Sequence, residues 1–226
     1  MDVAVRALDL SKLPPESWDA LVSLLNEEER ARAARFAFGE DRNSYIAAHA
    51  LLRAELSKRA GLPPQDWRFA AAAHGKPFLI DAPRDMRFSL SHTRGMVAVA
   101  ICEGVDIGVD VEPSDRRAES MKLAERFFAP EEVTLLRTVE GEARRDMFFA
   151  IWTLKEAVVK ATGQGLSRAL DSFAVSLDPP RVTMLDDPAQ AWSAAHWRKE
   201  KFHFALAAQG PVRIDFDLAQ AASLFP

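Results

Sequence analysis

Hydrophobic and polar positions divide the chain into alternating helical and strand-like blocks. From Asn26 to Ala60 the sequence is rich in Ala, Leu, Arg and Glu, and Gly61 follows it, which predicts two helices with a break near Gly39. Short apolar runs between turn residues then predict strands at 67–73, 74–80, 86–91, 95–102 and 105–112. Helical periodicity returns at 121–128, 129–139 and 144–161, and strands follow at 172–177, 181–185, 191–197 and 202–208. We expect 144–161 to be the one long uninterrupted helix.

This order, helices then strands and again helices then strands, predicts an α+β fold. Strand number and spacing agree on the two sides of a joint near residues 103–106, so we expect two similar α+β halves, residues 1–105 and 106–226. Any α+β chain can show such an order by chance, which is the competing interpretation. No low-complexity linker separates the halves, which favours one pseudo-symmetric body.

Composition narrows the class of protein. The chain has 226 residues, 48% of them hydrophobic and 27% charged, with a formal net charge of −4. Such a charge gives no basic field for nucleic acid or an anionic membrane. Neither a secretory leader nor a run of about 18 uncharged apolar residues occurs, so we expect a cytoplasmic protein without a membrane span. The single cysteine, Cys102, excludes disulfides within the chain and a cysteine-rich zinc site.

Two carboxylates share one face of the strand predicted at 105–112. Its odd-numbered positions are Val or Ile, so Asp110 and Glu112 project from the same side, about 7 Å apart. Their repulsion falls if a cation lies between them, and Mg²⁺ commonly takes one or two protein carboxylates with water and phosphate. The alternative is the solvated outer face of an edge strand.

The helix predicted at 144–161 offers a third carboxylate. Glu156 and Lys160 are four residues apart and share one helix face, among aromatic and aliphatic neighbours. A surface ion pair is the plain interpretation. The GQG sequence after the helix opens the backbone where a ligand could approach, which favours a functional role.

Further polar residues could bind an anion. Ser91 and His92 end a predicted strand and offer hydroxyl and imidazole donors, although a turn histidine is more often a plain surface residue. Adjacent strand residues point to opposite faces, which argues against a Ser-His nucleophile. Lys76 in the turn HGKP and Arg53 in a helical segment could together bind phosphate.

Taken in order, five motifs resemble those of the 4′-phosphopantetheinyl transferase superfamily. They are GKP, SLSH, GVDVE, RFFAPEE and W-x-x-KEA-x-x-K-x-x-G-x-GL, within a match from about residue 35 to about residue 173. The chain is similar to the Sfp-like type, which holds two halves in one chain. The resemblance implies a pseudo-dimer of two α+β halves with the active site in the cleft between them, and a monomer, because one chain already builds that cleft.

The resemblance also implies a reaction and its residues. The family transfers the phosphopantetheine arm of coenzyme A to a serine of an apo acyl or peptidyl carrier protein and releases 3′,5′-adenosine bisphosphate. Matched by position, the residues expected to hold Mg²⁺, or Mn²⁺ in its place, are Asp110, Glu112 and Glu156. Those expected to contact the cofactor are Arg32, Arg53, Lys76, Ser91, His92 and Lys160. Some members carry a basic residue where this chain has Glu29.

Catalysis is assigned to Glu156, Lys160 and His92. Glu156 is the expected base for the serine proton, directly or through water, while Lys160 and His92 donate to phosphate oxygens. Lys155 is either one half of a structural ion pair or a cofactor contact. The segment 114–128, with Arg116, Arg117, Lys122 and Arg126, either docks an acidic carrier or forms a core helix.

Two other classes of function compete with this prediction. Another Mg²⁺-dependent phosphate-ester enzyme, such as a nucleotide pyrophosphatase, would use the same residue types. A non-catalytic module that binds coenzyme A or a carrier is the second, and the carboxylate set argues against it. The sequence leaves open the carrier, the tolerance of acyl-coenzyme A and the choice between Mg²⁺ and Mn²⁺.

Overall fold

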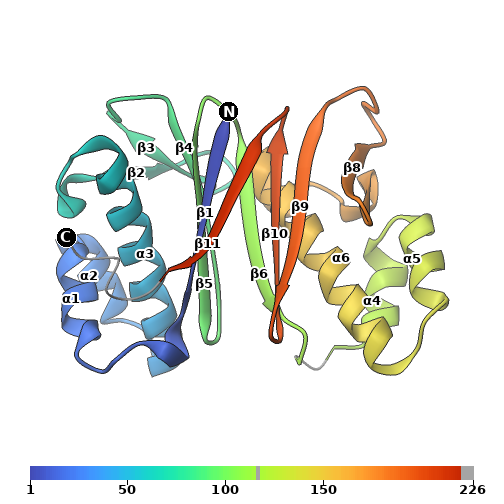
Figure 1. Cartoon of the computed structure of the whole chain (residues 1–226), viewed down its shortest axis with the longest axis horizontal. Coiled ribbons are helices and arrows are strands. Elements are labelled where there is room, and N and C mark those ends of the chain that lie inside the picture. The colour runs from blue at the N-terminus through green and yellow to red at the C-terminus, as the bar shows by residue number, and fades with distance from the viewer. Residues whose placement is uncertain (116–117, 220–226) are drawn as a thin grey trace. The chain divides into compact units, whose positions relative to one another are not determined.

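The computed structural model describes residues 1–115 and 118–219, which divide between two compact units (Figure 1). Unit 1 comprises Met1–Ala71, Pro77–Gly104 and the C-terminal strand that begins at Arg213. Unit 2 comprises Ala72–Lys76 and Val105–Val212. Each unit is described by itself below.

Unit 1 packs three α-helices against a four-stranded sheet of order β11-β1-β5-β4 and adds the hairpin β2–β3. Its strands are β1 (Asp2–Asp9), β2 (Arg68–Ala71), β3 (Pro77–Ile80), β4 (Met86–Thr93), β5 (Met96–Glu103) and β11 (Arg213–Ala219). Its helices are α1 (Ser17–Leu24), α2 (Glu27–Ala33) and α3 (Gly39–Ala60), with short 3₁₀ turns at Leu10–Lys12 and Pro64–Asp66.

Unit 2 packs three α-helices against a three-stranded sheet of order β6-β10-β9 and adds the hairpin β7–β8. Its strands are β6 (Ile107–Pro113), β7 (Phe173–Leu177), β8 (Pro180–Met184), β9 (Trp192–Lys199) and β10 (Phe202–Gln209). Its helices are α4 (Ser120–Phe127), α5 (Pro130–Arg137) and α6 (Gly141–Thr162), with 3₁₀ turns at Gly165–Ser167 and Leu170–Ser172.

The two units repeat one plan, which confirms the prediction of two similar α+β halves. In each, a strand is followed by helices, a small hairpin and two long antiparallel strands, and the last of these pairs with both the first and the one before it. The long helices α3 and α6 both have 22 residues and both end at a left-handed glycine, Gly61 and Gly163. The prediction that 144–161 is the only long helix is therefore wrong.

Three elements are absent from the sequence prediction: β1, α1 and β11. β11 pairs in parallel with β1, so Arg213–Ala219 groups with unit 1, whereas the predicted boundary assigns all of 106–226 to the second half. Ile214, Phe216 and Leu218 alternate with charged residues in β11, a period-two signal that would have identified this strand.

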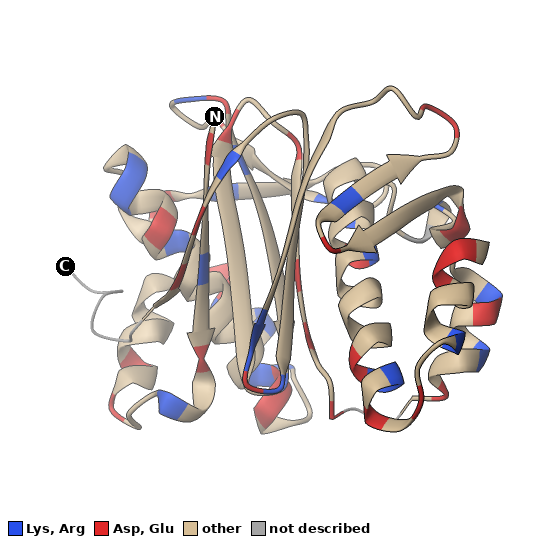
Figure 2. Ribbon diagram, turned by 45° about the vertical axis from the view of Figure 1, so that its right-hand side comes forward, with Lys and Arg blue, Asp and Glu red and all other residues tan. Residues whose placement is uncertain are grey.

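Each unit has its own apolar core. In unit 1, α3 buries Leu51, Leu52 and Leu56 together with Val97 and Val99 of β5. In unit 2, α6 lies along β6 and β10 and buries its own aromatic residues with Ala205 and Ala207 (Figure 1). None of the described helices is both long and apolar enough to cross a membrane. Lys and Arg are interspersed with Asp and Glu over the elements of each unit (Figure 2), as expected of a chain with a small net charge.

Candidate active site

A glycine brings β6 unusually close to α6. A Cβ atom added at Gly108 would lie 1.9 Å from the Ala157 carbonyl oxygen and 2.5 Å from the Ala161 nitrogen. No side chain fits there, so the strand backbone touches the helix backbone over one turn. Because Asp110 is two residues further along β6 and projects from the same face as Gly108, this contact brings its carboxylate to the turn of α6 that carries Glu156 and Lys160.

Asp110, Glu156 and Lys160 form one charged cluster in unit 2. The Lys160 Nζ atom donates to Asp110 Oδ1 at 2.7 Å. Asp110 is 4% exposed, whereas the Lys160 side chain is 31% exposed and can reach solvent. Burial, with repulsion from Asp110 adding to it, raises the pKa of Glu156, and Lys160 opposes that shift. The strand and the helix therefore hold two carboxylates together with one cation to balance them.

The chemistry of these donors fits Mg²⁺. Glu112 stands two residues beyond Asp110 on the same face of β6 and is half-buried. In the described ranges, no group of three or more His, Cys, Asp or Glu side chains is arranged to hold a metal ion. Mg²⁺ does not require three, because it commonly takes one or two carboxylates and completes its octahedron with water and phosphate oxygens. Burial is the main cause of the raised pKa of Glu156, and the repulsion from Asp110 that adds to it would fall if a divalent cation were bound.

Lys76 lies at the C-terminal end of α6. Its Nζ atom donates to the Ala161 carbonyl oxygen at 2.8 Å and lies 3.3 Å from Asp106 Oδ1. A Cβ atom at Gly163 would lie 3.0 Å from the Lys76 Cδ atom, so the lysine stem packs where the glycine leaves room. The GKP and GQG motifs therefore meet in unit 2, and a lysine at a helix C-terminus is favourable to the helix dipole.

Comparison with known proteins decides the family. A family model described as the 4′-phosphopantetheinyl transferase superfamily matches residues 106–209, and one described as 4′-phosphopantetheinyl transferase, N-terminal, matches residues 13–104. The 4′-phosphopantetheinyl transferase HetI of Nostoc sp. is 36% identical over 182 residues, which are 80% of this chain and 76% of that protein. This chain belongs to the 4′-phosphopantetheinyl transferase superfamily. The predicted family and enzyme class are confirmed.

Two further proteins show the range of similarity. The 4′-phosphopantetheinyl transferase Sfp of Bacillus subtilis is 32% identical over 165 residues, 73% of this chain and 72% of its own. A solved structure, a holo-(acyl-carrier-protein) synthase from Bacillus anthracis in complex with CoA, covers 46% of this chain and 96% of its own at 19% identity, with a TM-score of 0.41. Asp110, Glu156 and Lys160 all lie within the segment that the superfamily model matches.

Lys155 of the transferase's KEA motif is a buried structural cation. Its side chain is 0% exposed, and its Nζ atom lies 2.8 Å from Glu132 Oε2 and 2.8 Å from each of the Leu170 and Phe173 carbonyl oxygens. Burial lowers the pKa of Lys155 and raises that of Glu132, and their mutual attraction opposes both shifts. Of the two roles left open by the sequence, these contacts favour the structural ion pair.

Arg53 is buried in the same way in unit 1. Its side chain is 0% exposed, and Nε donates to Glu29 Oε2 at 2.6 Å while Nη1 donates to the carbonyl oxygens of Pro64 and Trp67. Glu29 also accepts from the Asn26 amide and lies 2.9 Å from His49 Nδ1. In this position Arg53 has no exposed surface to offer a phosphate, and we assign it a structural role with Glu29 as its partner.

The other residues predicted to contact coenzyme A lie in unit 1. Ser91 is buried and His92 is exposed, as expected for neighbours on β4 that point to opposite faces. Arg32 is exposed on α2, and its guanidinium lies 5.4 Å from the centre of the Tyr45 ring. Their contacts with the cofactor stay predictions.

Sequence reasoning missed a histidine chain in unit 2. His196 Nε2 lies 3.0 Å from His203 Nδ1, and His203 Nε2 lies 3.2 Å from Asp146 Oδ1, which also pairs with Arg198 at 3.1 Å. Burial lowers the pKa of His196 to about 4 and also lowers that of His203. His203 lies opposite Glu112 in the β6–β10 pairing, so these histidines adjoin the strand that carries Asp110 and Glu112. The only signal in the sequence is that the predicted strands 191–197 and 202–208, which follow one another along the chain, each contain a histidine.

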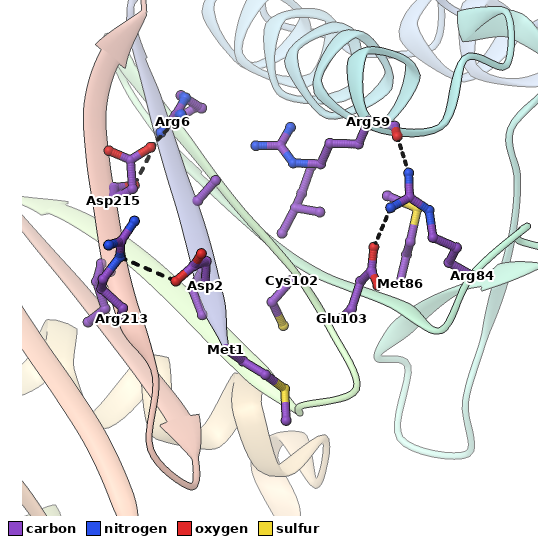
Figure 3. Close-up of a pocket in the computed structure, with 14 residues that line it drawn as sticks. Met1, Asp2, Arg6, Arg59, Arg84, Met86, Cys102, Glu103, Arg213 and Asp215 are labelled. Atoms are coloured by element: carbon purple, nitrogen blue, oxygen red, sulfur yellow. Dashed lines mark hydrogen bonds and ion pairs between the residues drawn. The ribbon is translucent and has the colours of Figure 1, made fainter.

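Unit 1 contains a pocket that differs chemically from the cluster in unit 2. It lies at the end of β1, β5 and β11, beyond the C-terminal end of α3, and six of its seven charged residues pair with one another (Figure 3). The pairs are Arg6 with Asp215, Arg213 with Asp2 and Arg84 with Glu103. The seventh, Arg59, pairs at 2.8 Å with Glu55, which does not line the pocket. Ion pairs therefore give this pocket a structural explanation.

Proposed function

We propose that this chain transfers the 4′-phosphopantetheine group of coenzyme A to a serine of an apo carrier protein and releases 3′,5′-adenosine bisphosphate. The observation that carries the proposal is the Asp110–Glu156–Lys160 cluster, built where Gly108 lets β6 touch α6, inside the segment matched by the superfamily model. The relatives HetI and Sfp, named as transferases of this kind, support it.

The metal in this proposal is Mg²⁺, held by Asp110 and Glu156 with Glu112 as the third carboxylate. When bound, it would neutralise the coenzyme A pyrophosphate and the charge that builds on the leaving oxygen. Lys160 neutralises Asp110 in the free protein and is exposed enough to turn its ammonium to a phosphate oxygen instead. Lys160 would then donate at the place where negative charge develops.

Glu156 is our candidate for the proton acceptor. The serine oxygen of the carrier attacks the β-phosphorus, the bond from that phosphorus to the bisphosphate oxygen breaks, and the serine proton passes to Glu156 directly or through water. Because Glu156 is also a proposed metal ligand, and a carboxylate that ligates a metal is a weaker base, we favour transfer of the proton through a water molecule. We propose that His92, Ser91, Lys76 and Arg32 contact the cofactor.

We propose that α4 contributes to docking of the carrier. Lys122, Glu125 and Arg126 are exposed on this helix, while Ala124 is buried against α6 and its neighbours. Arg116 and Arg117, which belong to the predicted docking segment, lie outside the described residues. Reversing Arg126 to Glu should raise the KM for the carrier and leave the KM for coenzyme A unchanged; equal changes in both would argue against docking at α4.

The experiment that tests the function is intact-mass spectrometry of several apo carriers after incubation with the protein, coenzyme A and Mg²⁺. Transfer adds one phosphopantetheine group to a carrier and releases one 3′,5′-adenosine bisphosphate. Release of the bisphosphate without modification of any carrier would indicate a pyrophosphatase. Binding of coenzyme A without either product would indicate a non-catalytic module.

We also propose that the protein is a monomer and is cytoplasmic. Sedimentation equilibrium tests the oligomeric state, and fractionation of the source cells tests the location.

A further inference from the structure

We propose that Lys155 is a positioning residue, which fixes the rotation of α6 about its axis and so directs Glu156 and Lys160 toward β6. The inference rests on the proposed function, because Glu156 and Lys160 matter only if the cluster with Asp110 binds metal and phosphate. It gives the Lys of the KEA motif a role that involves no contact with the cofactor.

The contacts of Lys155 tie α6 to three other segments. Its Nζ atom reaches Glu132 of α5, the Leu170 carbonyl before β7 and the Phe173 carbonyl at the start of β7, each at 2.8 Å. An ammonium group has three N–H donors, so these partners use all of them. The Phe173 ring lies under the same ammonium at 4.5 Å. No donor is left for a phosphate, which assigns Lys155 to the scaffold.

Glu132 is held as firmly as the lysine that it pairs with. Its Oε2 atom also accepts from the Ala129 amide at 2.9 Å, at the N-terminus of α5, and its Oε1 atom accepts from the Val175 amide at 2.7 Å, in β7. Glu132 is 2% exposed. We call the set Lys155, Glu132 and their backbone partners the unit 2 clamp; it joins α5, α6 and β7.

The clamp and the charged cluster occupy different sides of one helix. Neighbouring helix residues point about 100° apart, while residues four apart share a face. With Lys155 anchored toward α5 and β7, Glu156 and Lys160 are turned toward β6, where the Gly108–Ala157 contact holds the strand. A rotation of α6 large enough to free Lys155 would move both side chains away from Asp110.

Unit 1 repeats the clamp without the acidic cluster. Arg53 and Lys155 are both the fifteenth residue of their 22-residue helices, and Glu29 and Glu132 are both the third residue of a preceding short helix. Arg53 likewise donates to two carbonyl oxygens after its helix and lies 5.0 Å from a phenylalanine ring. The next residue in α3 is Ala54, where α6 has Glu156. The clamp therefore serves the helix in both units, and only in unit 2 does it have a catalytic side chain to direct.

The test compares matched clamp variants by two measurements, binding of Mn²⁺ alone by electron paramagnetic resonance and the thermal unfolding midpoint. In unit 2 the variant is Lys155→Met with Glu132→Gln; in unit 1 it is Arg53→Met with Glu29→Gln. We expect both pairs to lower the unfolding midpoint. At a temperature where all proteins are folded, only the unit 2 pair should weaken Mn²⁺ binding, by about tenfold or more, as loss of a supporting residue commonly does. Lys155→Arg should bind Mn²⁺ as the wild type does, because arginine fills this position in unit 1.

The outcomes separate this inference from the function on which it rests. Wild-type protein that binds no more Mn²⁺ than Glu156→Gln would overturn the metal site itself, whatever the clamp does. A wild type that binds Mn²⁺, together with a folded unit 2 variant of equal affinity, would overturn the positioning role alone. Should the unit 2 pair fail to fold, Lys155→Arg decides: a stable Lys155→Arg protein that binds Mn²⁺ as weakly as Glu156→Gln does would overturn the positioning role, because an arginine that keeps the clamp closed should also keep the metal site.

Discussion

Unit 1 and unit 2 share a plan down to a buried salt bridge, yet they carry opposite charges at matching positions. Asp110 of β6 and Arg6 of β1 each lie opposite the fourth residue of the partner strand, Ala205 and Val99. Asp110 pairs with Lys160 of the long helix, whereas Arg6 pairs with Asp215 of β11 and lies 3.9 Å from Glu55. The same fold thus carries, in unit 2, an acidic cluster whose chemistry suits a metal ion and, in unit 1, a pocket whose arginines form ion pairs with acidic residues.

The comparison separates what the fold needs from what the chemistry needs. A feature present in both units, such as the clamp, is explained by packing a long helix on a sheet. A feature present in one, such as Gly108, Glu156 or the histidine chain, requires another explanation. Unit 1 has Ala4, Ala54 and Val97 at the positions that correspond to Gly108, Glu156 and His203.

The largest effect is expected where the units agree. Glu29→Gln and Glu132→Gln each leave a buried cation without its charged partner, so we expect each to cost about 3–5 kcal/mol of unfolding free energy. Urea denaturation of the two variants measures it. A loss near zero in one unit, with the full loss in the other, would mean that the two clamps are not equivalent.

The next effect tests the close contact of β6 with α6. Gly108→Ala puts a Cβ atom 1.9 Å from a backbone oxygen, so we expect a loss of about 3 kcal/mol or more and loss of transfer activity. The control is Ala4→Gly in unit 1, for which about 0.5–1 kcal/mol is expected with activity retained. A Gly108→Ala protein of wild-type stability and turnover would show that the contact does not position Asp110.

A smaller effect on stability is expected when the pH is lowered. His196 has its pKa lowered to about 4 by burial and by neighbouring His203. Between the ordinary histidine pKa near 6.5 and that value, the unfolded chain takes up a proton that the folded chain refuses, so stability falls as the pH falls. His196→Gln should flatten the dependence of the unfolding midpoint on pH in this window. Unit 1 has no such effect to offer at the corresponding position, because Leu90 has no titratable group. Identical pH profiles of variant and wild type would contradict the assignment.

The smallest effect belongs to the pocket of unit 1. Arg6 and Asp215 form an exposed pair at 2.7 Å, and such pairs contribute about 0–1 kcal/mol. Asp215→Asn should therefore change the unfolding free energy little and leave transfer to the carrier unchanged. A severalfold fall in turnover would show that the pocket takes part in the reaction.

Much of the fold could be predicted because its signals are local. The helix ends at Gly61 and Gly163 and the alternating strands β4, β5, β6 and β10 are explicit in the sequence. The pairing of β11 with β1 is not, because it joins segments that are about two hundred residues apart and depends on the whole unit. Local patterns cannot report such a contact.

The site was predictable in part for the same reason. The alternation of the strand predicted that Asp110 and Glu112 share one face, and helical spacing predicted the same for Glu156 and Lys160. The hydrogen bond from Lys160 to Asp110 agrees with both predictions, because it joins those two faces. Arg53 has its partner Glu29 24 residues away, and neither its full burial nor this pairing follows from a helical pattern. The capping pattern of Asn26 and Glu29 was nevertheless readable in the sequence and would have indicated a structural role for Glu29.

The central claim is that the acidic cluster of unit 2 performs the transfer, and the most direct test is a single-turnover measurement on Glu156→Gln. With enzyme in excess over apo carrier, and coenzyme A and Mg²⁺ saturating, the rate of mass gain on the carrier reports the chemical step. We predict that Glu156→Gln abolishes transfer, while its affinity for coenzyme A stays within a few-fold of the wild type. A folded Glu156→Gln protein that retains most of the wild-type rate of carrier modification would contradict the account.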